Sequence, residues 1–240
     1  MNKIILSFIF ILCCNELFAQ NKTINIPKYL NGNTIYLHAY IQNLASHLEL
    51  ELISKSNDSI NLRIWLSNQV IDIWSIKNNI FEGTLINYIE TAKKTSFITR
   101  NNKLIFSKVK LDTFTSHIIF NLFQSIDNIP SKENIKNWKG GKDGETYIFE
   151  KSDKFNYSFK NYWSPCCQDS LLFDAKKIEQ LIKDILSISV LAIQGKKFYN
   201  NLPKGLYKEA QGFRLLIKKK TTSKTLKKLN YSIKKYRQLE

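Results

Sequence analysis

Residues 145–163 read ETYIFEKSDKFNYSFKNYW, and this stretch decides the fold that the sequence predicts. Aromatic residues recur at alternate positions on both sides of SDK (152–154), as in two strands joined by a tight turn. The stretch is the most aromatic part of the chain, with rings at Tyr147, Phe149, Phe155, Tyr157, Phe159 and Trp163. We therefore predict an antiparallel hairpin whose aromatic side chains, Tyr147, Tyr157 and Trp163 among them, belong to the core.

Upstream of this hairpin, residues 48–111 follow a period of two in several separate runs. LELELISKS (48–56) alternates leucine with glutamate, SNDS supplies turn residues, and INLRIWLS (60–67) alternates aliphatic residues with Asn61, Arg63 and Trp65. These two runs predict a further hairpin. VIDIWSI (70–76), residues 81–89 and KLIFSKVKL (103–111) continue the pattern, so the first half is predicted to be mostly an antiparallel meander.

Three stretches have the period of amphipathic helices. Residues 35–47 form the first. A second begins at Asp112 or Thr113, either of which can cap it, and ends before Pro130. The predicted fold class is therefore α+β: an antiparallel meander sheet packed by two or three amphipathic helices.

The third helix is predicted from Asp174, as its cap, to Gln194, with Gly195 ending it. Its inward face is predicted to comprise Ile178, Leu181, Ile182, Ile185, Leu186, Ser189 and Ala192. We expect Leu181 to pack against the aromatic strands as part of the core.

A resemblance covers DGETYIFEKSDKFNYSFKNYWSP, residues Asp143 to Pro165, about a tenth of the chain. This segment resembles a pattern in uncharacterised secreted bacterial proteins. In that pattern Asp-Gly precedes a strand, a glutamate ends it, and a tyrosine-rich return strand finishes in Trp-Ser-Pro. The resemblance implies export and an α+β architecture, and it implies no chemical activity.

The chain begins MNKIILSFIFILCCNELFAQ, which has the composition of a secretory signal peptide (1–19), with cleavage predicted after Ala19 or Gln20. A lipid anchor on Cys13 or Cys14 and a retained membrane anchor are the alternatives, although the apolar run is short for a bilayer of roughly 30 Å. No second long apolar stretch follows, so no transmembrane helix is expected after cleavage. We predict a periplasmic or secreted protein with one domain at 20–219, possible lobes at 20–130 and 131–219, and a basic tail at 220–240.

The chain carries 36 basic and 20 acidic residues and a net charge of +16, much of it after Arg214. Basic residues gain affinity for phosphate through counterion release, but export argues against a nucleic-acid partner. Contact of the basic tail with an anionic envelope surface is one interpretation. The other is that the lysine excess is compositional, because residues with AT-rich codons are abundant throughout.

Cys166 and Cys167 lie in YWSPCCQDS (162–170). Neighbouring Cα atoms lie about 3.8 Å apart, less than the roughly 4.4 to 6.8 Å usual for disulfides, so a bond between these two would be strained. They could be free thiols in a structural corner, a vicinal redox disulfide, or the nucleophile of an envelope enzyme. We favour the corner: Pro165 turns the chain, Trp163 anchors it, and the thiols fill space beside the indole.

Other chemistry finds little support in the sequence. A cysteine nucleophile needs a histidine base, and the chain has only His38, His47 and His117. Zinc and serine-hydrolase motifs are absent from the sequence. The sequence therefore predicts no catalytic residue, no metal and no cofactor.

Acids flank the aromatic hairpin at Asp143, Glu145 and Glu150, as in some carbohydrate sites. Glu150 is alternatively predicted to pair with Lys160 across the hairpin. The favoured function is a non-enzymatic secreted or periplasmic protein with a binding or structural role. An envelope enzyme using Cys166 or Cys167, and an inhibitor or immunity-like partner with an apolar patch on the meander, are the alternatives.

Overall fold

The computed structural model describes residues 22–27, 36–56, 58–77, 80–92, 103–141, 144–208 and 215–218. The predicted signal peptide, its cleavage site, the basic tail and Asp143 lie outside these residues. Within them, no helix is long and apolar enough to cross a membrane.

Nine strands form one sheet, and its order is β1-β7-β6-β2-β3-β4-β8-β9, with β5 also paired to β4. The strands are β1 (Thr23–Asn25), β2 (Ile60–Trp65), β3 (Gln69–Lys77), β4 (Ile80–Thr91), β5 (Leu104–Leu111), β6 (Thr146–Asp153), β7 (Asn156–Trp163), β8 (Gly205–Lys208) and β9 (Leu215–Lys218). The meander β2–β5 and the aromatic hairpin β6–β7 are antiparallel, as predicted. The sheet as a whole is mixed, because β1 pairs with β7 in parallel, which corrects the purely antiparallel prediction.

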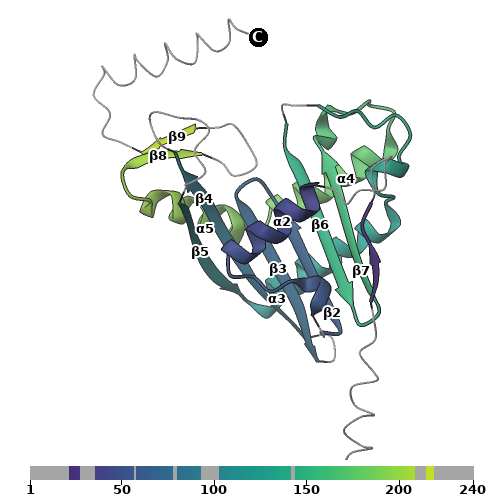
Figure 1. Ribbon diagram of the computed structural model, residues 1–240, viewed down its shortest axis with the longest axis horizontal. Coiled ribbons are helices and arrows are strands. Elements are labelled where there is room, and N and C mark those ends of the chain that lie inside the picture. The colour runs from purple at the N-terminus through teal and green to yellow at the C-terminus, as the bar shows by residue number, and fades with distance from the viewer. Residues whose placement is uncertain are drawn as a thin grey trace, which may run out of the picture.

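Helices cover both faces of this sheet (Figure 1). They are α2 (Tyr36–His47), α3 (Thr113–Gln124), α4 (Phe173–Leu186) and α5 (Ser189–Asn201), with short 3-10 turns η1 (Ile53–Lys55), η2 (Ser125–Asn128), η3 (Lys132–Asn134) and η4 (Pro165–Cys167). Helix α2 crosses one face, and α3, α4 and α5 lie on the other (Figure 1). The α+β class is therefore correct.

Apolar clusters fill both interfaces. Residues of the sheet pack against α3 and α4 in one cluster, which includes Leu62, Ile64, Phe149, Ile119, Phe123, Ile178 and Leu181. The second cluster joins α2 to the opposite face and includes Ile41, Leu44, Trp65, Ile148, Tyr157 and Phe159. Because helices cover both faces, β2 is buried almost throughout. Its polar side chains therefore do not face solvent, as they would in a meander with one uncovered face.

The hairpin predicted from LELELISKS and INLRIWLS is wrong. Residues 49–56 form no strand; Glu49 has a positive φ of 54°, and a 3-10 turn follows at Ile53–Lys55. Leu48 and Ile53 are buried against α2 and its face of the sheet. β2 instead pairs with β3 and β6, so the alternation of leucine and glutamate reflects a half-exposed connection.

The helix predicted at 174–194 is two helices. After α4, the Ser187 hydroxyl donates to the Asp184 carbonyl at 2.6 Å, and Ile188 takes an extended conformation before α5 begins. Such a serine bond to the preceding turn competes with helix continuation. Asp174 lies inside the first turn of α4 and does not cap it, and Gly195 lies within α5 rather than ending a helix.

The break also changes which side chains face inward. Ile178, Leu181, Ile182 and Ile185 are buried as predicted. Leu186, Ser189 and Ala192 are exposed, because the chain turns between the helices. The predicted stripe therefore ends with α4, and α5 buries a different set of residues, Leu191, Gly195 and Phe198.

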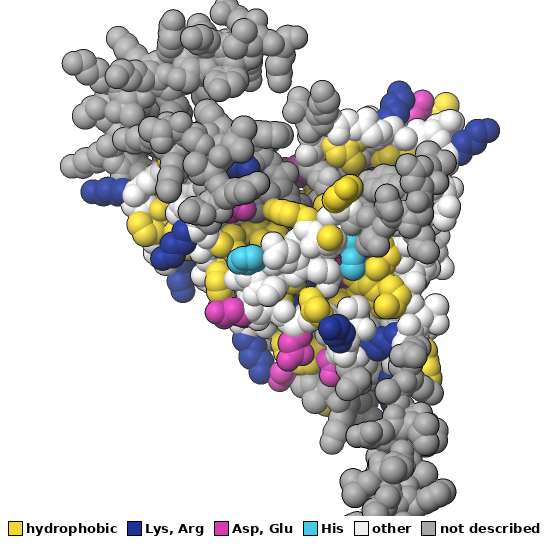
Figure 2. Space-filling view, in the orientation of Figure 1, with side chains coloured by type: hydrophobic (Ala, Val, Ile, Leu, Met, Phe, Trp, Pro, Cys, Tyr) yellow, Lys and Arg dark blue, Asp and Glu magenta, His cyan; other side chains and the backbone are white. Residues whose placement is uncertain are grey.

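Lysine and arginine side chains are scattered over the described surface of the α2 face (Figure 2). They do not gather there into one patch. The part of the chain that carries the densest charge, after Arg214, lies almost wholly outside the described residues, so contact with an anionic envelope surface stays a prediction.

Candidate functional site

Three charged residues form a buried row across the α2 face of the sheet. Arg63 of β2 lies opposite Asp72 of β3 and Glu150 of β6, so a cation stands between two carboxylates. The residues are 1%, 8% and 0% exposed, respectively. The Arg63 guanidinium donates to both Asp72 oxygens, from Nε at 3.2 Å and from Nη2 at 3.0 Å. Such bidentate pairing is the strong form of an arginine and carboxylate contact.

Glu150 is held by side chains from three elements. Its Oε2 accepts from Trp65 Nε1 at 2.6 Å, and its Oε1 accepts from Gln42 Nε2 at 3.0 Å and from the Tyr157 hydroxyl at 2.6 Å. The Tyr157 hydroxyl also lies 3.1 Å from His38 Nε2. Because Gln42 and His38 belong to α2, these contacts fix the helix on the sheet.

Burial and charge shift the pKa values of Asp72, Arg63 and Tyr157. Burial raises the pKa of Asp72, against the opposing effect of Arg63. Burial works to lower the pKa of Arg63, but Asp72 and Glu150 outweigh it and raise the pKa. Burial also raises the pKa of Tyr157, with Glu150 adding to the shift, so Tyr157 stays a hydrogen-bond donor.

The predicted pairing of Glu150 with Lys160 is wrong, because the two residues are offset by one position in the register of the β6–β7 hairpin. Glu150 lies opposite Phe159, and Lys160 lies opposite Phe149. Lys160 therefore projects to the other face, where its ammonium donates to the carbonyls of Ile126 at 2.8 Å and Ile129 at 2.7 Å. A one-residue change of register moves a side chain to the opposite face, which is why the two groups never meet.

The row is closed to solvent, and the helix that covers it is held by its own hydrogen bonds. One atom, Arg63 Nη1, is buried with no hydrogen-bond partner. The arrangement is well suited to fixing α2 in place and poorly suited to admitting a ligand.

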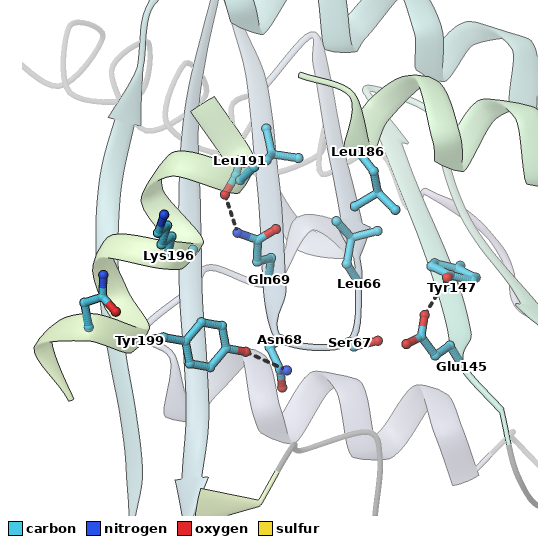
Figure 3. A pocket seen from close by; sticks show the side chains of 13 residues that line it. Leu66, Ser67, Asn68, Gln69, Glu145, Tyr147, Leu186, Leu191, Lys196 and Tyr199 are labelled. Atoms are coloured by element: carbon cyan, nitrogen blue, oxygen red, sulfur yellow. Dashed lines mark hydrogen bonds between the residues drawn. The ribbon is translucent and has the colours of Figure 1, made fainter. Parts of the chain in front are cut away.

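An open cleft of about 580 Å³ lies at the end of the sheet where β2 turns into β3 (Figure 3). The turn residues Leu66–Gln69 form its floor, Glu145 and Tyr147 form one side, and α5 with the end of α4 forms the other. These walls come from four separate segments of the chain. The volume is in the range of small-molecule sites.

Amide side chains organise the floor. Gln69 Nε2 donates to Asn87 Oδ1 at 2.7 Å and to the Leu191 carbonyl at 3.0 Å, which joins β3 to β4 and α5. Asn68 Nδ2 donates to the Tyr199 hydroxyl at 2.8 Å. Asn68 Oδ1 and Asn87 Nδ2 are buried and have no hydrogen-bond partner in the structure. Asn68 lines the cleft itself, and Asn87 lies behind Gln69.

The opposite wall carries a second polar pair. The Tyr147 hydroxyl donates to Glu145 Oε2 at 2.6 Å, and Figure 3 shows the pair facing the turn from the side across from Tyr199. Partial burial raises the pKa of Tyr147, and Glu145 raises it further. Tyr147 is half-buried, so one edge of its ring remains available at the cleft.

The other residues that the sequence places in the core differ in how far they are buried. Tyr157 and Leu181 are buried, at 0% and 4% exposure. Pro165 is buried and begins η4, while Trp163 is only half-buried.

Cys166 and Cys167 are free and exposed, so they do not fill space beside the indole. Burial in the corner was the wrong expectation, because Gly141 and Gly144 occupy the space beside Trp163 instead. A Cβ on either glycine would collide with that ring.

The histidines do not meet the thiols among the described residues. His38 contacts Tyr157, His47 Nδ1 lies 2.8 Å from the Asn43 carbonyl, and His117 lies against Phe81. The described residues also contain no group of three or more histidine, cysteine or acidic side chains that could hold a metal ion. The envelope-enzyme alternative therefore lacks its general base in this structure.

Comparison of the chain with protein-family models gives no match, and comparison with curated proteins gives no similar sequence. The resemblance of residues 143–165 to secreted bacterial proteins therefore stays an expectation.

Proposed function

We propose that this is a non-enzymatic exported protein that binds a small, uncharged polar molecule in the cleft between the β2–β3 turn and α5. The observation that carries the proposal is the open cleft of about 580 Å³ itself, which combines leucine walls with the amide side chains of Asn68 and Gln69 at its floor.

The side chains around the cleft favour a ligand with hydroxyl groups on a compact ring. Leu66, Leu186 and Leu191 offer apolar contact, while Asn68 and Gln69 offer directional hydrogen bonds. Aromatic rings of Tyr147 and Tyr199 flank the opening. Apolar walls with a few placed polar groups are the usual composition of a small-molecule site. A neutral sugar ring combines an apolar face with hydroxyl donors and acceptors in the required way.

Binding is favoured over sugar hydrolysis. Hydrolysis uses two carboxylates separated by about 5 to 9.5 Å around the scissile bond. Glu145 lines the cleft, but Glu150 is 0% exposed on the α2 face and is bound to three donors. The structure thus offers one carboxylate at the cleft among its described residues.

The immunity-like alternative requires an apolar patch on the meander. Within the described part of β2–β5, Ile80 is the one large hydrophobic residue that is clearly exposed, at 51%. A single exposed residue is normal for a protein surface and does not define an interface.

The test is an NMR titration of the full chain with glucose and with N-acetylglucosamine. Binding is monitored through the amide chemical shifts. We expect shifts confined to residues 66–69, 145–147 and 191–200. An Ala192→Trp variant places an indole in the cleft and should abolish them. Ala39→Trp is the matched control, because Ala39 is an exposed alanine of α2 on the other face.

Saturable shifts that persist in Ala192→Trp would place sugar binding elsewhere and overturn the site. Absence of shifts with either sugar at millimolar concentration would overturn the ligand class. Release of a free reducing sugar from a glycoside would overturn the non-enzymatic assignment.

A further inference from the structure

The corner that carries Cys166 and Cys167 is held by hydrogen bonds that do not involve either thiol. Ser164 takes a left-handed conformation, with φ 40° and ψ 66°, between the end of β7 and η4. Its hydroxyl accepts from the Glu145 amide at 3.1 Å, and its amide donates to the Glu145 carbonyl at 2.7 Å. The turn is therefore tied to the start of β6.

Gln168 closes the other side of the corner. Its Oε1 accepts from the Lys139 amide at 2.8 Å, and its Nε2 lies 3.1 Å from the carbonyls of Lys139 and Trp163 and 3.3 Å from that of Ser164. One side chain thus joins the loop at 139 to the end of β7. The two cysteines between these anchors are presented on a fixed backbone.

The sulfur atoms stand 3.6 Å apart, and both thiols are free and exposed. A disulfide would require about 2.05 Å between them. Two thiolates on one tetrahedral ion, with metal–sulfur bonds of about 2.3 Å, would stand about 3.8 Å apart. The fixed corner therefore holds the sulfurs near the separation of a chelate and far from that of a disulfide.

We propose that Cys166 and Cys167 together chelate one thiophilic d10 cation of the Zn²⁺ class, as an open and exchangeable site. On binding, each thiol loses its proton and each sulfur forms one bond to the ion, so one divalent ion displaces two protons and no electron is transferred. Soft thiolates select such ions over magnesium or calcium. The site is separate from the cleft and does not depend on the cleft ligand.

Two features make the site exchangeable rather than structural. The hydrogen bonds of Ser164 and Gln168 already hold the corner without a metal. The described residues add no third histidine, cysteine or acidic ligand, and within them the proposed tetrahedral ion has two protein ligands, fewer than a structural zinc site has.

The test is an anaerobic titration with Cd²⁺, which gives a sulfur-to-metal charge-transfer band, of the reduced full-length chain carrying Cys13→Ser and Cys14→Ser, so that Cys166 and Cys167 are its only thiols. We expect one ion per chain and release of two protons, with Zn²⁺ competing for the same site. Reduced protein without metal should react with iodoacetamide at both positions, and bound Zn²⁺ should protect them.

Variants separate chelation from incidental thiol binding. Cys166→Ser and Cys167→Ser should each weaken Cd²⁺ binding by roughly 100-fold, because the second ligand acts at high effective concentration. Gln168→Ala keeps both thiols but loosens the corner, and we expect about 10-fold weaker binding from the lost preorganisation. Circular dichroism of each variant verifies that the fold is retained.

Three results would overturn the proposal: unchanged affinity in either single serine variant, one ion shared between two chains, or unchanged affinity in Gln168→Ala. Rapid formation of a Cys166–Cys167 disulfide in preference to metal binding would equally contradict it.

Discussion

The two faces of the sheet are both covered by helices, yet they are filled by different kinds of side chain. Against α3 and α4, the sheet presents an apolar cluster that contains Leu62, Phe149 and Leu181. Against α2, apolar residues surround the charged row of Asp72, Arg63 and Glu150. Apolar packing is strong but non-directional, whereas charge-assisted hydrogen bonds impose one geometry. Apolar packing therefore stabilises both faces, and we expect the charged row to fix the position of α2 in addition.

The largest expected effect is on the charged row. Arg63→Met leaves two carboxylates buried without their cation and should lower the free energy of unfolding by about 3 to 5 kcal/mol. Urea denaturation at neutral pH measures the loss. The double variant Arg63→Met with Asp72→Leu removes one stranded charge and should lose less than the single variant. A loss below about 1 kcal/mol for Arg63→Met would mean that water reaches the row.

The second largest effect on stability is expected on the apolar face that packs against α3 and α4. Leu181→Ala should cost roughly 2 to 5 kcal/mol, because it leaves a cavity between α4 and the sheet. Leu171 is the matched control, since it is 90% exposed and its change to alanine should stay within about 0.5 kcal/mol. Equal effects at the two positions would contradict the burial of the α4 stripe. The readout is again the midpoint and slope of denaturant unfolding.

A smaller effect depends on pH and belongs to the α2 face. Partial burial lowers the pKa of His38 below its ordinary value of 6.5, with the charge of Glu150 opposing the shift. A lowered pKa gives stability that is present above pH 6.5 and is lost as the pH falls through the folded-state pKa. Wild type should therefore lose more stability than His38→Gln on acidification.

The measurement is the difference in unfolding free energy between wild type and His38→Gln at several pH values from 8 to 5. In the wild type, His38 Nε2 lies 3.1 Å from the Tyr157 hydroxyl. Glutamine can form the same hydrogen bond but does not titrate, so His38→Gln is a suitable reference. If the difference in unfolding free energy stays constant across this range, the pKa of His38 is the same in the folded and unfolded states. A larger loss in the variant would reverse the predicted sign.

The smallest effect is expected outside both faces. Replacing Cys166 and Cys167 together with serine should change metal-free stability by no more than about 0.5 kcal/mol, because both residues are exposed. Trp163→Ala, which removes a half-buried ring beside Gly141 and Gly144, should cost more. Thermal unfolding of the two variants in chelator makes the comparison. A larger loss in the serine variant would restore a packing role for the thiols.

Much of the secondary structure is readable from the sequence because it rests on local periodicity. Strands β2 to β7 and helices α2 and α3 fall where the periods of two and 3.6 place them, and the Asp112 cap accepts from the Thr115 amide at 2.8 Å. The errors come from interactions between distant segments. Period alone could not reveal that α2 covers the second face, which buries Arg63 and places Trp65 beside Glu150.

The cleft was harder to anticipate than the fold. Glu145 and Tyr147 stand out in the sequence as part of the aromatic hairpin, but Asn68, Gln69 and Tyr199 have no motif spacing. Their meeting depends on the break between α4 and α5, which turns α5 over the start of β3 and the adjoining part of β4. The available signal was Ser187-Ile188-Ser189, where two serines interrupt an otherwise continuous stripe.

The place of β2 in the sheet also sets an order of events in folding. One neighbour, β3, follows directly in the chain, but the other is β6, where Trp65 pairs with Ile148 after α3 and a long connection. Closing so long a loop is slow relative to local pairing, so the meander should form first and the β6–β7 hairpin should dock later. In pulsed hydrogen exchange, amides of β3 and β4 should gain protection before those of β6, and simultaneous protection would contradict this order. Until docking, one edge of β2 is unpaired and open to association with other chains, so the refolding yield should fall as protein concentration rises.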